Sequence, residues 1–157
     1  MEKCQCVDIK DSDWHLQDMD WSGKFLYYDL LPHFLGMPLG FEKKVQYLKR
    51  QIAEKAYKLV NPDMILQESG TFRGAILMEI EDPGQYDANV EQLENVCVLT
   101  RVYNGPAGNI KQGIGELRAF VLDRKHFPPA KIYLWYITCS SCIKRRGKAK
   151  VVLLGRL

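Results

Sequence analysis

The sequence predicts an α+β domain built from two pseudo-symmetric strand-helix-strand-strand units. Residues 131–137, Lys-Ile-Tyr-Leu-Trp-Tyr-Ile, form an aromatic and β-branched run that is typical of a central strand. Residues 41–60 place apolar side chains every three or four positions, as an amphipathic helix does. The order strand, helix, strand, strand occurs twice, which predicts an antiparallel sheet with both helices on one face and a ligand groove on the other.

Length and composition fit one globular domain. The chain has 157 residues, of which 46% are hydrophobic and 26% charged, and it is long enough for a sizeable core. It has no apolar run of about 18 residues, and its N-terminus lacks the apolar core of a signal peptide. We therefore expect a cytoplasmic protein without membrane association. A net charge of +3 is too small to indicate direct nucleic-acid binding.

The two ends of the chain differ in charge. Residues 1–20 carry six acidic and two basic side chains, a net charge of −4, whereas residues 143–157 carry six basic and no acidic side chains. We expect the two segments to pair or to be solvated; a basic tail for phosphate or nucleic acid is the alternative. We assign residues 1–20 to an acidic lead-in with a short element around Trp14. Residues 21–157 form a single domain, with repeat 1 at about 21–84 and repeat 2 at about 96–157.

Repeat 1 begins with a strand, continues with the amphipathic helix and ends with two further strands. The predicted elements are a strand at 24–31, a loop at 32–40, the helix at 41–60, a strand at 64–68, a turn at 69–71 and a strand at 72–81. Alternation in the last strand places Phe72, Ile76, Met78 and Ile80 on one face and Arg73, Ala75, Leu77, Glu79 and Glu81 on the other. A polar connector at 85–95 leads to repeat 2.

Repeat 2 follows the same order. The predicted elements are a strand at 96–103 stopped by Asn104-Gly105-Pro106, a helix at 107–125, the strand at 131–137, a turn at 139–147 and a strand at 150–154. Gly113 and Gly115 each lower the propensity of the helix by roughly 1 kcal/mol. We therefore expect another backbone to approach the helix closely at these positions.

The strand at 131–137 offers one face to a helix and one to a ligand. Ile132, Leu134 and Tyr136 form the first face, and Lys131, Tyr133, Trp135 and Ile137 form the second. Aromatic rings beside a Lys are what a ligand groove needs, because rings stack on flat apolar molecules and attract cations. We expect Tyr103, on the first strand of this repeat, to join Tyr133 and Trp135. Alignment of the repeats on Pro62 and Pro129 places Glu68 opposite Trp135.

Two segments of repeat 2 carry a resemblance to a known family. They are Arg101-Val-Tyr-Asn-Gly-Pro106, followed by an amphipathic helix, and Pro128-Pro-Ala-Lys-Ile-Tyr133. Over roughly residues 21–157 the chain resembles the GyrI-like small-molecule-binding domain, the effector-binding domain of multidrug-sensing bacterial transcription regulators, in a stand-alone form without a DNA-binding domain. The resemblance implies a groove between the repeats for bulky, hydrophobic, possibly cationic or reactive molecules, which serves sequestration, sensing or detoxification.

The resemblance also implies roles for individual residues. Relatives commonly carry a ligand-binding Glu two residues before the Tyr of the Pro-led strand, where this chain has Lys131; Glu68 and Glu79 are the substitutes that we nominate. Some stand-alone members are hydrolases that open strained cyclopropane rings of DNA-alkylating natural products with a groove Glu and an aromatic partner. Glu68 and Trp135 would be that pair, since a Glu in an apolar groove has a raised pKa and acts as a general acid or base. The expected ligand-binding set is Tyr103, Tyr133, Trp135, Glu68, Glu79 and Lys131.

The five cysteines leave a further alternative open. An odd number without a secretion signal argues for free thiols. Cys139-Ser-Ser-Cys142 offers two zinc ligands, to which Cys4 and Cys6 would add two more; redox cycling of the CxxC and simple free thiols are the alternatives. A heme-binding protein of related fold is another, although no axial ligand supports it. We expect no cofactor, a hydrophobic small molecule as ligand, and a protein partner or homodimer as further partners.

Overall fold

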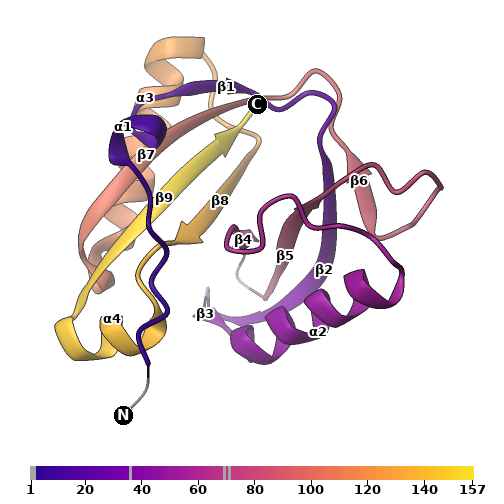
Figure 1. Ribbon diagram of the computed structural model, residues 1–157. Coiled ribbons are helices and arrows are strands. Elements are labelled where there is room, and N and C mark those ends of the chain that lie inside the picture. The colour runs from indigo at the N-terminus through magenta and orange to yellow at the C-terminus, as the bar shows by residue number, and fades with distance from the viewer. Residues whose placement is uncertain (1–2, 36, 69, 71) are drawn as a thin grey trace. The chain divides into compact units, whose positions relative to one another are not determined.

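The computed structural model describes residues 3–35, 37–68, 70 and 72–157 (Figure 1). Gly36, in the predicted loop at 32–40, and Ser69 and Thr71, in the predicted turn at 69–71, lie outside the described residues. The chain divides into two compact units. The central unit is Trp21–Val96, and the terminal unit combines Met1–Asp20 with Cys97–Leu157.

The central unit is an antiparallel sheet with one long helix, α2 (Phe41–Glu54), packed on one face. Its strands are β2 (Phe25–Phe34), β3 (Met37–Pro38), β4 (Leu66–Glu68), β5 (Arg73–Ile80) and β6 (Val90–Gln92). The spatial order is β4-β5-β2, and both β3 and β6 pair with β2. The strand β6 falls in the segment at 85–95 that was expected to be a connector.

The hydrophobic core of the central unit lies between α2 and the sheet. It consists of Tyr27, Leu48, Ile52, Ile76, Met78 and Ile80, all of them buried. Leu48 and Ile52 are one helical turn apart, so their side chains lie on the same side of α2. The predicted face of Ile76, Met78 and Ile80 is thus confirmed as the helix-covered face.

The helix α2 ends at Glu54 and not at Val60 as the sequence pattern predicts. Ala56 adopts a left-handed φ of 60°, and the Tyr57 backbone N–H donates to the Ile52 carbonyl in a Schellman arrangement that terminates the helix. The residues after Ala56 extend along β5, since Val60 N–H donates to the carbonyl of Glu79. Hydrogen bonds between residues 58–60 and the end of β5 therefore replace the helix that the apolar spacing predicts for these residues.

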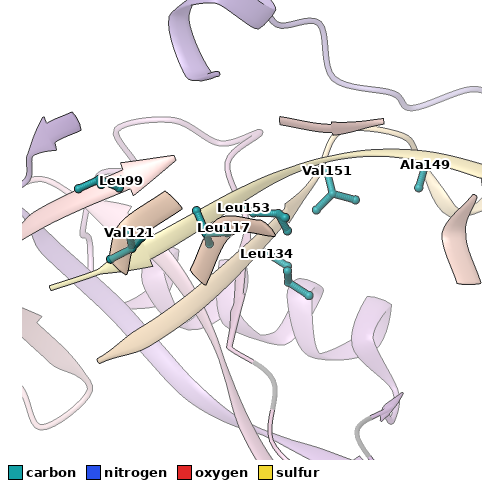
Figure 2. Packing of buried hydrophobic residues seen from close by; sticks show 7 residues of the cluster. All are labelled: Leu99, Leu117, Val121, Leu134, Ala149, Val151 and Leu153. Atoms are coloured by element: carbon teal, nitrogen blue, oxygen red, sulfur yellow. The ribbon is translucent and has the colours of Figure 1, made fainter. Parts of the chain in front are cut away.

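The terminal unit repeats this architecture with helix α3 (Ile110–Lys125), which follows a short 3-10 turn at Ala107–Asn109. Its remaining elements are α1 (Asp11–Trp14), β1 (Asp18–Asp20), β7 (Cys97–Pro106), β8 (Lys131–Tyr136), α4 (Ser140–Arg146) and β9 (Lys148–Arg156). The strands are antiparallel in the order β1-β7-β9-β8. Figure 2 shows the core between α3 and this sheet, made of Leu99, Leu117, Val121, Leu134, Ala149, Val151 and Leu153.

The two units share one topology. In the central unit the order of elements is β2, α2, β4, β5 with β5 between its neighbours, and in the terminal unit it is β7, α3, β8, β9 with β9 between its neighbours. Each unit pairs antiparallel strands and covers one sheet face with a helix. The α+β class and the duplicated strand-helix-strand-strand order are therefore confirmed.

Two predictions for elements of the terminal unit are wrong. The strand β7 runs through Asn104-Gly105-Pro106, because these residues continue the pairing with β9 as far as Pro106 opposite Lys148. The predicted turn at 139–147 is the helix α4, which buries Cys142 completely and ends at Gly147 with a left-handed φ of 69°. Residues up to Asp20 are part of the terminal unit, with β1 paired to β7, while the predicted short element near Trp14 is present as α1.

Among the described residues, no helix combines the length and the apolar character that crossing a membrane requires. The two charged ends, which were expected either to pair or to be solvated, are joined by an ion pair within the described part of the chain. The Lys150 ammonium lies 2.9 Å from the Asp11 carboxylate.

Candidate functional site

The aromatic strand β8 has the two faces that its alternation predicts. Ile132, Leu134 and Tyr136 pack on the core under α3, so Tyr133 and Trp135 lie on the opposite face. The side chains of both are buried, with 0% of Tyr133 and 2% of Trp135 exposed. This face is covered at Trp135 rather than open, and the ligand-binding role expected for the two rings stays a prediction.

The N-terminal segment supplies the cover over Trp135. The ring of Trp14 meets the ring of Trp135 edge-on, with centroids 5.1 Å apart and planes at 75°. Thr100 donates its hydroxyl proton to the Trp14 carbonyl, and Val7 N–H donates to the Ile137 carbonyl over 2.9 Å. Trp14 therefore lies on the face of the terminal sheet that α3 does not cover, and the chain then joins the edge of this sheet as β1. The sequence indicated a short element around Trp14, but it did not predict that Trp14 contacts Trp135.

Tyr103 lies on the other face of the same sheet. Its ring packs on the α3 core, and a Cβ built on Gly113 would come within 2.7 Å of it. The expected grouping of Tyr103 with Tyr133 and Trp135 is therefore corrected. The neighbour that leaves no space for a Cβ at position 113 is thus a side chain and not the second backbone that had been expected. A Cβ on Gly115 would meet nothing within 4 Å.

Lys131 and Tyr133 differ in their surroundings although they share a face. Lys131 is exposed at the start of β8, opposite Arg156 of β9. The Tyr133 hydroxyl accepts a hydrogen bond of 3.0 Å from the guanidinium of Arg156. Arg156, which sequence reasoning did not single out, thus fixes the buried phenol.

The two nominated glutamates lie on the helix-free face of the central sheet, which we define by Leu30, Phe34, Glu68, Ala75 and Glu79. Leu26 pairs with Glu79 in the register of β2 and β5, and Leu30, Ala75 and Glu68 face one another across β2, β5 and β4. Residues paired in this way share one side of a sheet. The prediction that Glu79 lies away from the face of Ile76 and Met78 is confirmed.

Glu79 forms an ion pair with Lys24. The Lys24 ammonium contacts both oxygens of Glu79, at 3.2 and 3.3 Å, and only 16% of the Glu79 side chain is exposed. Glu68 is half-buried and ends β4. Glu81 lies beyond the end of β5 and is exposed. The charge of Glu79 is thus neutralised by Lys24.

Exposed apolar side chains accompany Glu68. Leu30 is 60% exposed and Phe34 is 61% exposed, and both lie on the helix-free face because they alternate along β2. Ala75 lies between Leu30 and Glu68 in the register and carries only a methyl group. Large apolar side chains that are exposed on one sheet face are typical of an interaction site. The alternation of β2 could have identified Leu30 and Phe34 in the sequence.

The structure brings four of the five cysteines together at one end of the terminal unit. Cys4 and Cys6 come from the N-terminal segment, Cys139 precedes the first residue of α4, and Cys142 lies within α4. Their Sγ atoms all lie within 4.8 Å of one another. The fifth thiol, Cys97, is separate and donates a hydrogen bond of 2.7 Å to Asp18.

The pKa values of Cys139 and Cys6 are shifted in opposite directions. The Ser141 hydroxyl, the Gln5 backbone N–H and other donors lower the pKa of Cys139 to about 5. For Cys6, the backbone N–H of Cys139 lowers the pKa, but burial and the neighbouring thiols outweigh it and raise the pKa to about 12. The Cys6 thiol donates a hydrogen bond of 3.6 Å to Cys139 Sγ. Thiolates are the form of cysteine that reacts and binds metals.

A family model described as "Bacterial hydrolase" matches residues 1–157 of the chain. No curated protein and no solved structure matches the chain.

Proposed function

The chain belongs to the Bacterial hydrolase family, and from that premise we propose that it hydrolyses hydrophobic small molecules with Glu68 as the general base. The match over residues 1–157 is the single observation that carries the reaction class. The geometry of the helix-free face supports the assignment to Glu68.

Glu68 is the carboxylate that we assign as the base. Glu79 is held on the same face by the Lys24 ammonium, which contacts both of its oxygens. Glu68 ends a short strand, is half-buried and lies opposite Ala75 in the register of β4 and β5. We therefore place Glu68 at the reacting centre and give Glu79 a structural role.

The substrate is apolar on the side that the protein recognises. Leu30 and Phe34 expose most of their side chains on the helix-free face. Burying an apolar ligand against them gains roughly 25 cal/mol for each Å² removed from water. The similarity to the GyrI-like domain points the same way, because that resemblance implies bulky hydrophobic ligands.

The strained cyclopropane of an alkylating natural product is the substrate that we propose. Glu68 accepts a proton from a water molecule, and the water oxygen bonds to the less hindered ring carbon. The strained C–C bond breaks, and its electron pair moves into the conjugated carbonyl of the substrate. Glu68 then donates its proton to the carbonyl oxygen. Water is consumed, the ring is opened, and no oxidant or cofactor takes part.

The test follows a cyclopropane-bearing alkylator by chromatography and mass spectrometry. We expect the parent compound to disappear faster with protein than without, and a product heavier by one water to appear. Glu68→Gln should slow this conversion about 100-fold or more, which is the lower end of the usual contribution of a general base. Glu79→Gln is the matched control on the same face and should leave the rate within a few-fold of wild type.

Two results would overturn the proposal. If the parent compound disappears no faster with protein than without it, the protein does not open the cyclopropane ring. Equal rates in Glu68→Gln and wild type would remove Glu68 as the base even if hydrolysis occurs.

Binding without turnover is a second candidate, favoured by the exposure of Leu30 and Phe34. In that case the protein sequesters or senses its ligand. Equilibrium dialysis would then recover bound and chemically unchanged compound, and Leu30→Ser with Phe34→Ser would abolish retention while Glu68→Gln would not.

A further inference from the structure

We propose that Cys4, Cys6, Cys139 and Cys142 form a tetrahedral zinc site that fastens the N-terminal segment to the terminal unit. The Sγ atoms of Cys6 and Cys139 are 3.6 Å apart, and those of Cys4 and Cys142 are also 3.6 Å apart. Four thiolates bound to zinc at about 2.3 Å place their sulfur atoms about 3.8 Å from one another. All four sulfur atoms lie within 4.8 Å, so the ligands are assembled around a space that one ion fills.

The groups around the sulfur atoms fit a metal thiolate. The Gln5 backbone N–H donates to Cys139 Sγ over 3.4 Å, and the Cys139 backbone N–H donates to Cys6 Sγ over 3.3 Å. Such outer hydrogen bonds orient the ligands of a metal site. Each of these two hydrogen bonds also joins a residue of the N-terminal segment to Cys139 at the start of α4.

The local charge fits as well. Four thiolates and one divalent cation leave two negative charges. Arg145 donates a hydrogen bond of 3.0 Å from its guanidinium to Cys142 Sγ and so places a positive charge beside the cluster. Lys144 and Arg146 lie in the same last turn of α4 and add further positive charge. This gives a role to basic residues that the hydrolase proposal does not use.

Four sulfur ligands make a closed site. Zinc with four protein ligands has no open position for water or substrate and stabilises the fold instead of taking part in chemistry. The ligands come from two segments more than 130 residues apart in the chain. The ion would thus hold the segment that covers Trp135, and this role does not depend on the proposed hydrolysis.

Disulfides are the competing use of the same thiols. A disulfide needs the two sulfur atoms about 2.05 Å apart, so either close pair would have to move together by about 1.5 Å. Iron is the competing metal, because a tetrahedral set of four thiolates also accommodates it.

The test measures metal in protein produced without a histidine tag and purified under a reductant. We expect about one zinc per chain in wild type, near zero in Cys4→Ser and Cys6→Ser, and about one in Cys97→Ser. Cys97 is the matched control because its thiol lies outside the set and bonds to Asp18. Reduced protein without zinc, two disulfides in the intact mass, or one iron per chain would each overturn the proposal.

A second measurement keeps the decision clear if a variant fails to fold. Cobalt is titrated into chelator-treated wild type under reductant. Intense ligand-field absorption of a tetrahedral thiolate site, saturating at one cobalt and displaced by zinc, supports the site. Its absence overturns the site. Alkylation should modify mainly Cys97 in the metal-loaded protein and all five thiols after metal removal and unfolding.

Discussion

Trp14 and Trp135 meet edge to face, 5.1 Å between centroids, although more than a hundred residues separate them in the chain. Edge-to-face pairs add about 0.5–1.5 kcal/mol beyond the burial of their surfaces. The pair joins a short helix of the N-terminal segment to the C-terminal part of β8. The N-terminal segment is therefore a packed part of the terminal unit.

Removal of the Trp14 ring should destabilise the protein. Trp14→Ala should lower the free energy of unfolding by about 2–3 kcal/mol, somewhat less than for a fully buried aromatic residue because Trp14 is half-buried. Denaturant unfolding measures this change. Trp14→Phe is the matched control, and it should lose less than half as much because an edge contact with Trp135 remains. Equal stability of Trp14→Ala and wild type would contradict the packing role.

Gly113 and Gly115 should respond in opposite ways to alanine. A Cβ at Gly113 would lie 2.7 Å from the Tyr103 ring, so Gly113→Ala should displace the ring and lower the free energy of unfolding by about 1–3 kcal/mol. A Cβ at Gly115 meets nothing within 4 Å, so Gly115→Ala should raise the free energy of unfolding by up to about 1 kcal/mol through the higher helix propensity of alanine. Thermal unfolding of both variants checks the pair. Destabilisation by both substitutions would contradict this explanation.

Asp87 should contribute stability that is lost in acid. Burial alone would raise the pKa of Asp87, but hydrogen bonds from Lys55, the Asn89 backbone and Tyr57 outweigh it and lower the pKa. A carboxylate whose pKa is lower when folded stabilises the fold above its unfolded value of about 3.9, and this contribution is lost as the pH falls through the folded pKa. The free energy of unfolding should therefore decline below about pH 4.

Asp87→Asn should remove this part of the acid dependence. It should also lower the stability at neutral pH by about 1–3 kcal/mol, because Lys55 loses its charged partner and an NH2 group replaces one of the two oxygens that accept from Lys55, Tyr57 and the Asn89 backbone. Asp123→Asn on the exposed side of α3 is the control and should leave both quantities close to wild type. Chemical denaturation at a series of pH values gives both. An unchanged acid slope in Asp87→Asn would show that other carboxylates govern acid unfolding.

Ala75→Leu should block the proposed ligand surface. The larger side chain would occupy the place between Leu30 and Glu68 on the helix-free face. Loss of about 1.4 kcal/mol of binding free energy corresponds to a tenfold weaker affinity, which we take as the minimum effect. Isothermal titration with the cyclopropane-bearing compound measures it, and Ala75→Ser is the control of similar size. Equal affinities would place the ligand elsewhere.

Local pattern predicts the long elements well because their periodicity is set by the cores that they cover. The alternation of Ile76, Met78 and Ile80 and the stripe of α2 both follow from one shared core. The end of α2 was less predictable, since residues after Ala56 gain a sheet edge that lies distant in sequence.

The faces of neighbouring strands depend on register, which the sequence does not give. Tyr103 was expected beside Trp135, but its register opposite Val151 of β9 turns it toward α3. A strand such as β1, with the composition Asp-Met-Asp, has no intrinsic signal and exists because the edge of β7 pairs with it.

The cysteine set lies between these cases. Its residue types and the CxxC spacing were visible in the sequence, and the zinc alternative named the same four residues. Their convergence was not visible, because it depends on α4 and on the path of the N-terminal segment, both of which are fixed by long-range contacts such as the hydrogen bond from Val7 to Ile137.

The division of the chain into a continuous and an interrupted unit has a consequence for biosynthesis. As the polypeptide leaves the ribosome, Trp21–Val96 emerges whole and can complete its sheet at once. The preceding segment must wait, because β1 pairs with β7, and Cys4 and Cys6 meet their sulfur partners only when α4 has been translated. Maturation of the terminal unit is therefore a late step that needs both ends of the polypeptide, and an error at either end leaves the other without its partner.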